Sequence, residues 1–156
     1  MIVFILMLAV TLLAAGVSKF VLGKRADWRA CMRAGLAAAL LFAGIDHLVT
    51  PGRYLSMMPD YLPLHFELVI FTGVCEIAGA IGLLWRRTRK LAGVMLAIYF
   101  VAVFPANLHN ALHGTPIEGM PQDAWYYWLR LAFQPVLLAW ALYCSGAWRL
   151  RRRKRR

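Results

Sequence analysis

The chain has 156 residues, of which 62% are hydrophobic and 16% are charged, and its mean hydropathy is +0.61. Soluble domains average roughly 45–50% apolar and about 25% charged residues, so the composition excludes a water-soluble globule. This length allows one domain, and several apolar segments of about 20 residues would use most of it. Any chemistry must therefore lie within the membrane or at its surface.

Five apolar segments follow one another along the chain. Their approximate bounds are 1–22, 34–50, 66–85, 91–112 and 125–146. Each is continuously apolar rather than alternating, which favours helices over barrel strands, because only a helix satisfies its backbone groups within one segment. The sequence thus predicts an all-α polytopic transmembrane bundle, with residues 1–156 forming a single membrane domain.

The first segment has no basic residue ahead of its apolar core, as a secretory signal would have, so we expect a retained helix. Small residues recur four apart in several segments, as in Ala39 and Ala43 or Gly93 and Ala97. That spacing allows helix backbones to approach closely, although alanine richness alone also produces it.

Basic residues fall into three clusters that close apolar segments. The formal net charge is +11, and 16 of the 18 lysines and arginines lie at 19–33, at 86–90 and at 149–156. By the positive-inside rule, five spans with the N-terminus outside and the C-terminus inside place all three clusters in the cytoplasm. A four-span arrangement would require the first segment to be cleaved or peripheral. We expect a bacterial inner-membrane protein whose basic tail, residues 147–156, anchors the topology or contacts anionic lipid. We do not expect nucleic-acid binding, because no aromatic residue is interleaved with the basic run.

Two outer loops interrupt this pattern. Residues 51–65 read PGRYLSMMPDYLPLH, which is too apolar for a free loop and too rich in proline for a helix. We expect this segment to lie in the interface or to cap the bundle. Residues 113–123 are typical of an ordinary exterior connection, and the aromatic run that follows predicts an interfacial belt.

Glu76 is the sharpest functional candidate. It lies about ten residues into the third segment, roughly 14 Å deep, where an ionisable group costs several kcal/mol unless it is paired or faces a cavity. His47 ends the second segment, Pro105 should loosen the fourth segment about a turn before it, and Asn107 follows that proline. Arg130 and Gln134 share a face of the fifth segment. We expect a polar pocket that opens outward, formed by His47, Glu76, Asn107, Arg130 and Gln134.

Two interpretations of this set remain open. In the first, Glu76 and Arg130 neutralise each other and the amides tie helices together. In the second, the pocket binds a polar head such as a quinone ring, with His47 and an amide donating hydrogen bonds and Glu76 carrying protons. A network that surrounds a cavity can do both.

Metal and thiol chemistry have weak signals. His109 and His113 have the spacing of two ligands on one helix face, but they lack the glutamate of metalloprotease helices, and we predict no metal site. Cys31, Cys75 and Cys144 form no C-x-x-C motif, which disfavours a dithiol relay.

Four blocks in order, AGIDHLVTPGRYLSMMPDYLPLH, TGVCEIAGAIGLL, AGVMLAIYFVAVFPANL and WLRLAFQPVLLAWAL, resemble the DoxX-like family of small bacterial membrane proteins over about 35–143. The resemblance implies a four-helix transmembrane core, here preceded by one extra helix. Some members resemble or form the membrane subunit of a thiosulfate:quinone oxidoreductase. The positions that match the motifs are His47, Pro59, Tyr61, Pro63, Glu76, Pro105, Asn107, Arg130, Gln134 and Trp140.

The function predicted from these features is a quinone-linked or redox-associated membrane subunit with a pocket on the periplasmic side. Glu76 and His47 would be its reactive groups, and Asn107, Arg130, Gln134 and Tyr61 would bind the ligand. Because no flavin, haem-attachment or dithiol motif is present, two-electron chemistry would need a redox partner protein or substrates brought face to face in the pocket. The alternative is a non-enzymatic protein that binds or moves a lipid or small molecule, or an assembly factor, through the same pocket.

Overall fold

The computed structural model describes residues 2–23, 25–55, 58–59, 61–114, 121 and 123–148. Every regular element in these ranges is helical, as the sequence predicts. The elements are α1 (Ile2–Gly16), the π-helix η1 (Val17–Val21), α2 (Trp28–Val49), α3 (Gly52–Leu55), α4 (His65–Leu84), α5 (Arg89–Ala102), α6 (Phe104–His113) and α7 (Ala124–Ser145).

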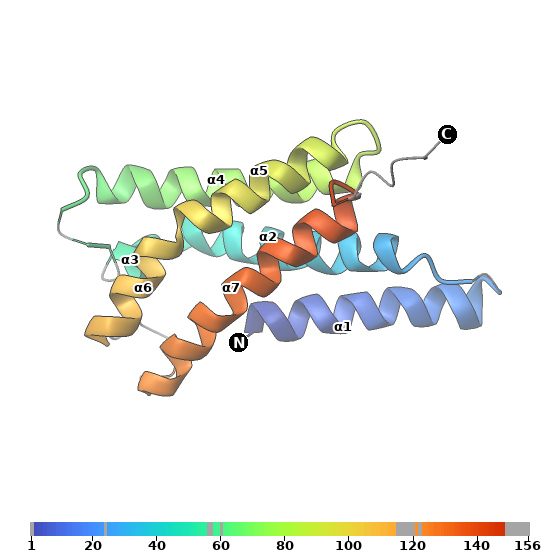
Figure 1. Ribbon diagram of the computed structural model, residues 1–156, viewed down its shortest axis with the longest axis horizontal. Coiled ribbons are helices and arrows are strands. Elements are labelled where there is room, and N and C mark those ends of the chain that lie inside the picture. The colour runs from blue at the N-terminus through green and yellow to red at the C-terminus, as the bar shows by residue number, and fades with distance from the viewer. Residues whose placement is uncertain are drawn as a thin grey trace, which may run out of the picture.

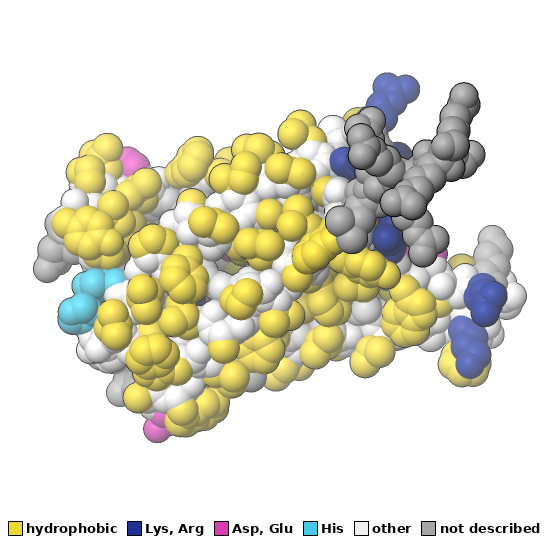
Figure 2. Space-filling view, viewed as in Figure 1, with side chains coloured by type: hydrophobic (Ala, Val, Ile, Leu, Met, Phe, Trp, Pro, Cys, Tyr) yellow, Lys and Arg dark blue, Asp and Glu magenta, His cyan; other side chains and the backbone are white. Residues whose placement is uncertain are grey.

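Four helices are long and apolar enough to cross a membrane, namely Ile2–Val21, Trp28–Val49, His65–Leu84 and the α5–α6 unit Arg89–His113. The fifth predicted segment is α7, which has the length of a span at 22 residues and carries Arg130 and Gln134. Exposed apolar side chains cover the body of the molecule (Figure 2), as expected of a protein whose sides face lipid rather than water. These are the properties of a membrane protein.

Local sequence explains where the helices begin and break. The apolar pattern predicts a second helix from about residue 34, but α2 begins at Trp28. It begins earlier because the Asp27 carboxylate caps it, accepting hydrogen bonds from the backbone N–H of Arg29 (3.0 Å) and Ala30 (3.3 Å). The α5–α6 unit breaks at Val103, two residues before Pro105, which has no N–H to donate to the preceding turn. The predicted loosening before Pro105 therefore takes the form of a kink, visible where α6 turns away from α5 (Figure 1).

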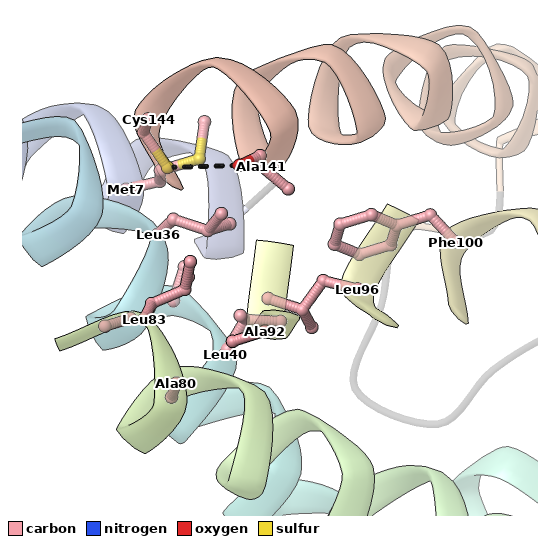
Figure 3. Close-up of a cluster of buried hydrophobic side chains, with 12 residues drawn as sticks. Met7, Leu36, Leu40, Ala80, Leu83, Ala92, Leu96, Phe100, Ala141 and Cys144 are labelled. Carbon is pink, nitrogen blue, oxygen red and sulfur yellow. Dashed lines mark hydrogen bonds between the residues drawn. The ribbon is translucent and has the colours of Figure 1, made fainter. Parts of the chain in front are cut away.

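The core is a cluster of buried aliphatic and small side chains from five helices. Met7, Leu36, Leu83, Leu96 and Cys144 meet there (Figure 3), and Cys144 donates to the Ala141 carbonyl at 3.6 Å. Because Met7 is only 2% exposed, α1 is an integral part of the bundle rather than a peripheral segment. Figure 1 shows that α1 starts near the middle of the long axis, and its first turn contributes Val3 and Phe4 to the wall of a cavity between the helices.

Glycines allow the closest helix approaches. A Cβ at Gly44 of α2 would lie 2.7 Å from the Gly73 backbone oxygen, and a Cβ at Gly73 of α4 would lie 2.8 Å from the His47 Cβ. The missing side chains let α2 and α4 pack backbone to backbone. His47 is thereby brought onto the face of α4 that carries Glu76.

The charged residues divide the molecule into two ends. On the face shown in Figure 2, lysine and arginine side chains lie at one end and histidine side chains at the other, whereas Arg53 and Arg130 belong to the polar networks toward the histidine end. We call these the basic end, which includes Lys19, Arg25, Arg29 and Arg86–Lys90, and the histidine end, which includes His109 and His113. The basic tail from Arg149 onward lies outside the described residues.

Candidate functional site

One cavity of about 210 Å³ lies among the helices on the histidine side of the core. All five residues predicted to converge line it, namely His47, Glu76, Asn107, Arg130 and Gln134. These five polar side chains therefore share one cavity. The walls are apolar and aromatic, and include Val3 and Phe4 of α1, Phe100, Val103 and Leu137.

Glu76 is the centre of a hydrogen-bonded triad. The carboxylate is buried, and its Oε2 lies 3.1 Å from His47 Nδ1 while its Oε1 accepts a hydrogen bond from the Tyr99 hydroxyl at 2.9 Å. The three side chains come from α4, α2 and α5, so the triad joins three helices around the cavity. Burial of the carboxyl is tolerated because each of its oxygens has a partner.

The opposite wall is formed by α6 and α7. Arg130 Nη2 donates to Asn107 Oδ1 at 3.4 Å, and the guanidinium lies 6.0 Å from the centre of the Tyr126 ring. Gln134 Nε2 donates to the Phe100 carbonyl at 3.5 Å. Glu76 thus takes its hydrogen bonds from His47 and Tyr99 rather than from Arg130, and the mutual neutralisation considered from the sequence is not the arrangement found.

A second network lies next to His47, toward the histidine end. The Asp46 carboxylate accepts bonds from Arg53 (2.8 Å and 2.9 Å), Thr50 (3.0 Å) and the Tyr54 hydroxyl. The Tyr54 ring packs edge-on against His47 at 3.8 Å between centroids, and Tyr54 also lines the cavity. Burial and the hydrogen bond to Asp46 raise the pKa of the Tyr54 phenol above its usual value.

Sequence reasoning missed three of these residues and misplaced one. Tyr54, Tyr99 and Asp46 were not singled out, although Asp46 precedes His47 directly and Tyr99 is the polar aromatic in the middle of its span. Tyr61 was predicted to bind the ligand, but its side chain is 71% exposed and does not line the cavity. The tyrosines that line the pocket are instead Tyr54 of α3, Tyr99 of α5 and Tyr126 of α7.

The described residues of the 51–65 loop include some that pack against the bundle. Its helix α3 brings Tyr54 to the pocket, and Pro59 is buried, with its carbonyl 3.1 Å from His65 Nε2. Met57 and Asp60 of this loop, like Glu118 of the next, lie outside the described residues.

The histidine pair forms a stack on the surface of α6. The rings of His109 and His113 are 4.1 Å apart with 27° between their planes, and His113 Nδ1 lies 2.8 Å from the His109 carbonyl. Within the described ranges, no group of three histidine, cysteine or acidic side chains is arranged to hold a metal ion. Cys31, Cys75 and Cys144 are free thiols.

Comparison with known families identifies one match. Residues 36–145 match the model of a domain of unknown function, DUF8561. The chain belongs to this family. No curated protein and no solved structure matches it.

The matched range, residues 36–145, includes the polar lining of the pocket but not the lining from α1. Every polar group described around the cavity, from His47 to Gln134, lies inside it. The two α1 residues on the wall, Val3 and Phe4, lie before it. The family domain thus supplies the polar chemistry of the pocket, and α1 adds an apolar wall.

Proposed function

We propose that this protein is a quinone-binding membrane subunit associated with redox chemistry, and that the cavity holds the quinone head group. The observation that carries the proposal is the triad of His47, Glu76 and Tyr99 on the wall of a cavity that also has apolar and aromatic lining. Interconversion of a quinone and a hydroquinone moves two protons along with two electrons. Imidazole and carboxyl groups are the side chains best suited to exchange those protons near neutral pH.

The size of the cavity supports a head group rather than a whole ligand. Pockets that enclose drug-sized molecules have volumes of roughly 300–1,000 Å³, whereas this cavity has about 210 Å³. One substituted ring fits this range, and an isoprenoid tail would extend into the surrounding lipid. The apolar walls from Phe4, Phe100 and Leu137 suit the faces of such a ring.

We also propose a membrane topology and a cellular location for the protein. The molecule would cross the bacterial inner membrane five times, with α7 as the fifth span, the N-terminus outside and the C-terminus inside. Support comes from the separation of the basic end from the histidine end (Figure 2), because lysine and arginine favour the cytoplasmic side. The pocket would then open toward the periplasm, and the basic tail would meet anionic lipid of the inner leaflet.

We also propose that the protein is related to the DoxX-like family and works with a redox partner protein. From the motif resemblance we infer that the helices after α1 form a DoxX-like four-helix core, in which His47, Glu76 and Arg130 would occupy motif positions and to which α1 would be an addition. Electrons would pass to or from a separate redox protein, with this chain acting as the membrane subunit of an oxidoreductase.

The test is extraction of the purified protein followed by mass spectrometry of retained small molecules, together with a redox difference spectrum. We expect a quinone that is lost in His47→Ala and kept in Tyr61→Phe, since Tyr61 is exposed and away from the cavity. Circular dichroism would show that both variants stay helical. A retained lipid or solute without a redox response would refute the quinone assignment and favour a non-enzymatic binding protein.

A further inference from the structure

The amide oxygen of Gln134 is a buried acceptor without a donor in the part of the chain that the structure describes. Gln134 lines the cavity and is 6% exposed, and its Oε1 has no hydrogen-bond partner among the described residues. The amide cannot simply be reversed, because its Nε2 faces the Phe100 carbonyl, which only accepts. An unsatisfied buried polar atom destabilises the empty site, so a bound molecule that supplies a donor gains affinity.

The same cavity has further acceptor capacity at Glu76. An ionised carboxylate offers about four lone-pair positions, and the contacts with His47 and Tyr99 use two of them. Two side chains from different helices therefore present oxygen acceptors to one small space. A ligand that only accepts hydrogen bonds would leave the Gln134 and Glu76 oxygens without a donor, and its own oxygen would be repelled by them.

We propose that the pocket binds the hydroquinone form of its ligand in preference to the quinone form. This inference rests on the proposed function, because it names which redox state of the quinone couple the site takes. A quinone carbonyl oxygen can only accept, whereas a hydroquinone hydroxyl donates to Gln134 Oε1 and still accepts from another group. The pocket thus selects its ligand by the hydrogen on the ring oxygen.

Preferential binding of the reduced form changes the redox balance of the bound couple. For a two-electron couple, each tenfold difference in affinity shifts the midpoint potential by about 30 mV. If the donor to Gln134 recovers about 1.4 kcal/mol, within the range for a buried unsatisfied group, the hydroquinone binds tenfold more tightly. The bound couple then has a midpoint potential about 30 mV higher than the free couple.

The experiment is titration calorimetry of the detergent-solubilised full chain, freed of retained quinone, with decylbenzoquinone and with decylbenzohydroquinone under anaerobic conditions. We expect the hydroquinone to bind at least tenfold more tightly than the quinone. In Gln134→Leu the two affinities should become equal within about twofold. Leu137→Ala is the matched control, because it removes an apolar wall on the same helix and should weaken both forms alike, leaving their ratio unchanged.

The outcomes separate this inference from the proposed function. Equal affinities in the wild type, or tighter binding of the quinone, overturn the inference and leave quinone binding intact. Absence of binding by either form overturns the proposed function itself. Should Gln134→Leu fail to fold, a redox titration of the wild-type complex still decides, since a midpoint potential at or below that of the free couple contradicts hydroquinone preference.

Discussion

Replacement of Glu76 separates the two roles that its carboxylate can have. In Glu76→Gln the amide keeps the shape of the side chain, its oxygen can accept from the Tyr99 hydroxyl and its nitrogen can donate to His47 Nδ1. Hydrogen bonds to a charged group are stronger than neutral ones, but burial of a neutral amide also costs less desolvation, and these effects oppose each other. We expect the free energy of unfolding to fall by about 1 kcal/mol or less.

Glu76→Leu has a different expected result. It leaves His47 and Tyr99 without their partner inside the bundle, at about 1–3 kcal/mol for each unsatisfied group. The loss of stability should therefore be roughly 2–6 kcal/mol, several times that of the glutamine variant. Both variants remove the exchangeable carboxyl proton from the pocket.

The assay measures ligand retention and thermal unfolding on the same preparations of wild type, Glu76→Gln and Glu76→Leu. If the carboxylate serves the ligand, Glu76→Gln loses at least tenfold in quinone affinity, equivalent to about 1.4 kcal/mol, while it unfolds near the wild-type temperature. If Glu76→Gln instead unfolds as early as Glu76→Leu and its folded fraction keeps the ligand, the reasoning is refuted. The triad would then be a structural link between helices.

Three further predictions concern Tyr54 on the cavity wall, the packing of α2 against α4, and the membrane topology. Tyr54→Phe should reduce ligand retention while Tyr61→Phe leaves it unchanged, because only Tyr54 lines the cavity. The pKa of Tyr54 in the folded protein is above its unfolded value of about 10. The stabilisation from this phenol is therefore complete below pH 10 and is lost as the pH rises through the folded pKa. Tyr54→Phe should flatten the fall in unfolding temperature that is measured above pH 10. Gly44→Ala should destabilise the bundle in thermal unfolding by about 1–3 kcal/mol through overpacking, whereas Gly16→Ala, where an added Cβ meets nothing within 4 Å, should be neutral or slightly stabilising. In a chain whose native cysteines are replaced by alanine, a membrane-impermeant maleimide added to intact spheroplasts should label His113→Cys and not Arg87→Cys, and the reverse pattern would disprove the proposed orientation.

Some contacts of the site could not be read from the sequence. Helical spacing placed Glu76 deep in its span and Gln134 at a similar depth, and both line the pocket. Spacing within one helix cannot determine which groups pair across helices, so Arg130 was considered as the partner of Glu76 where the structure has His47 and Tyr99. The assignment of Tyr61 failed for a related reason, since the path of a proline-rich loop depends on what it packs against.

The amino-acid sequence alone predicts an all-helical membrane protein, the positions of its long helices apart from the start of α2, and that Glu76 and Gln134 face the interior. These features follow from local periodicity and from the cost of placing polar groups in lipid, and both are properties of each segment alone. The packing of the helices adds that α1 belongs to the bundle, that Tyr54 and Tyr99 reach His47 and Glu76, and that the Gln134 oxygen has no donor among the described residues. Those features depend on how closely α2 and α4 approach at Gly44 and Gly73 and on how α5 and α6 kink at Val103, which set the distances between side chains far apart in the chain.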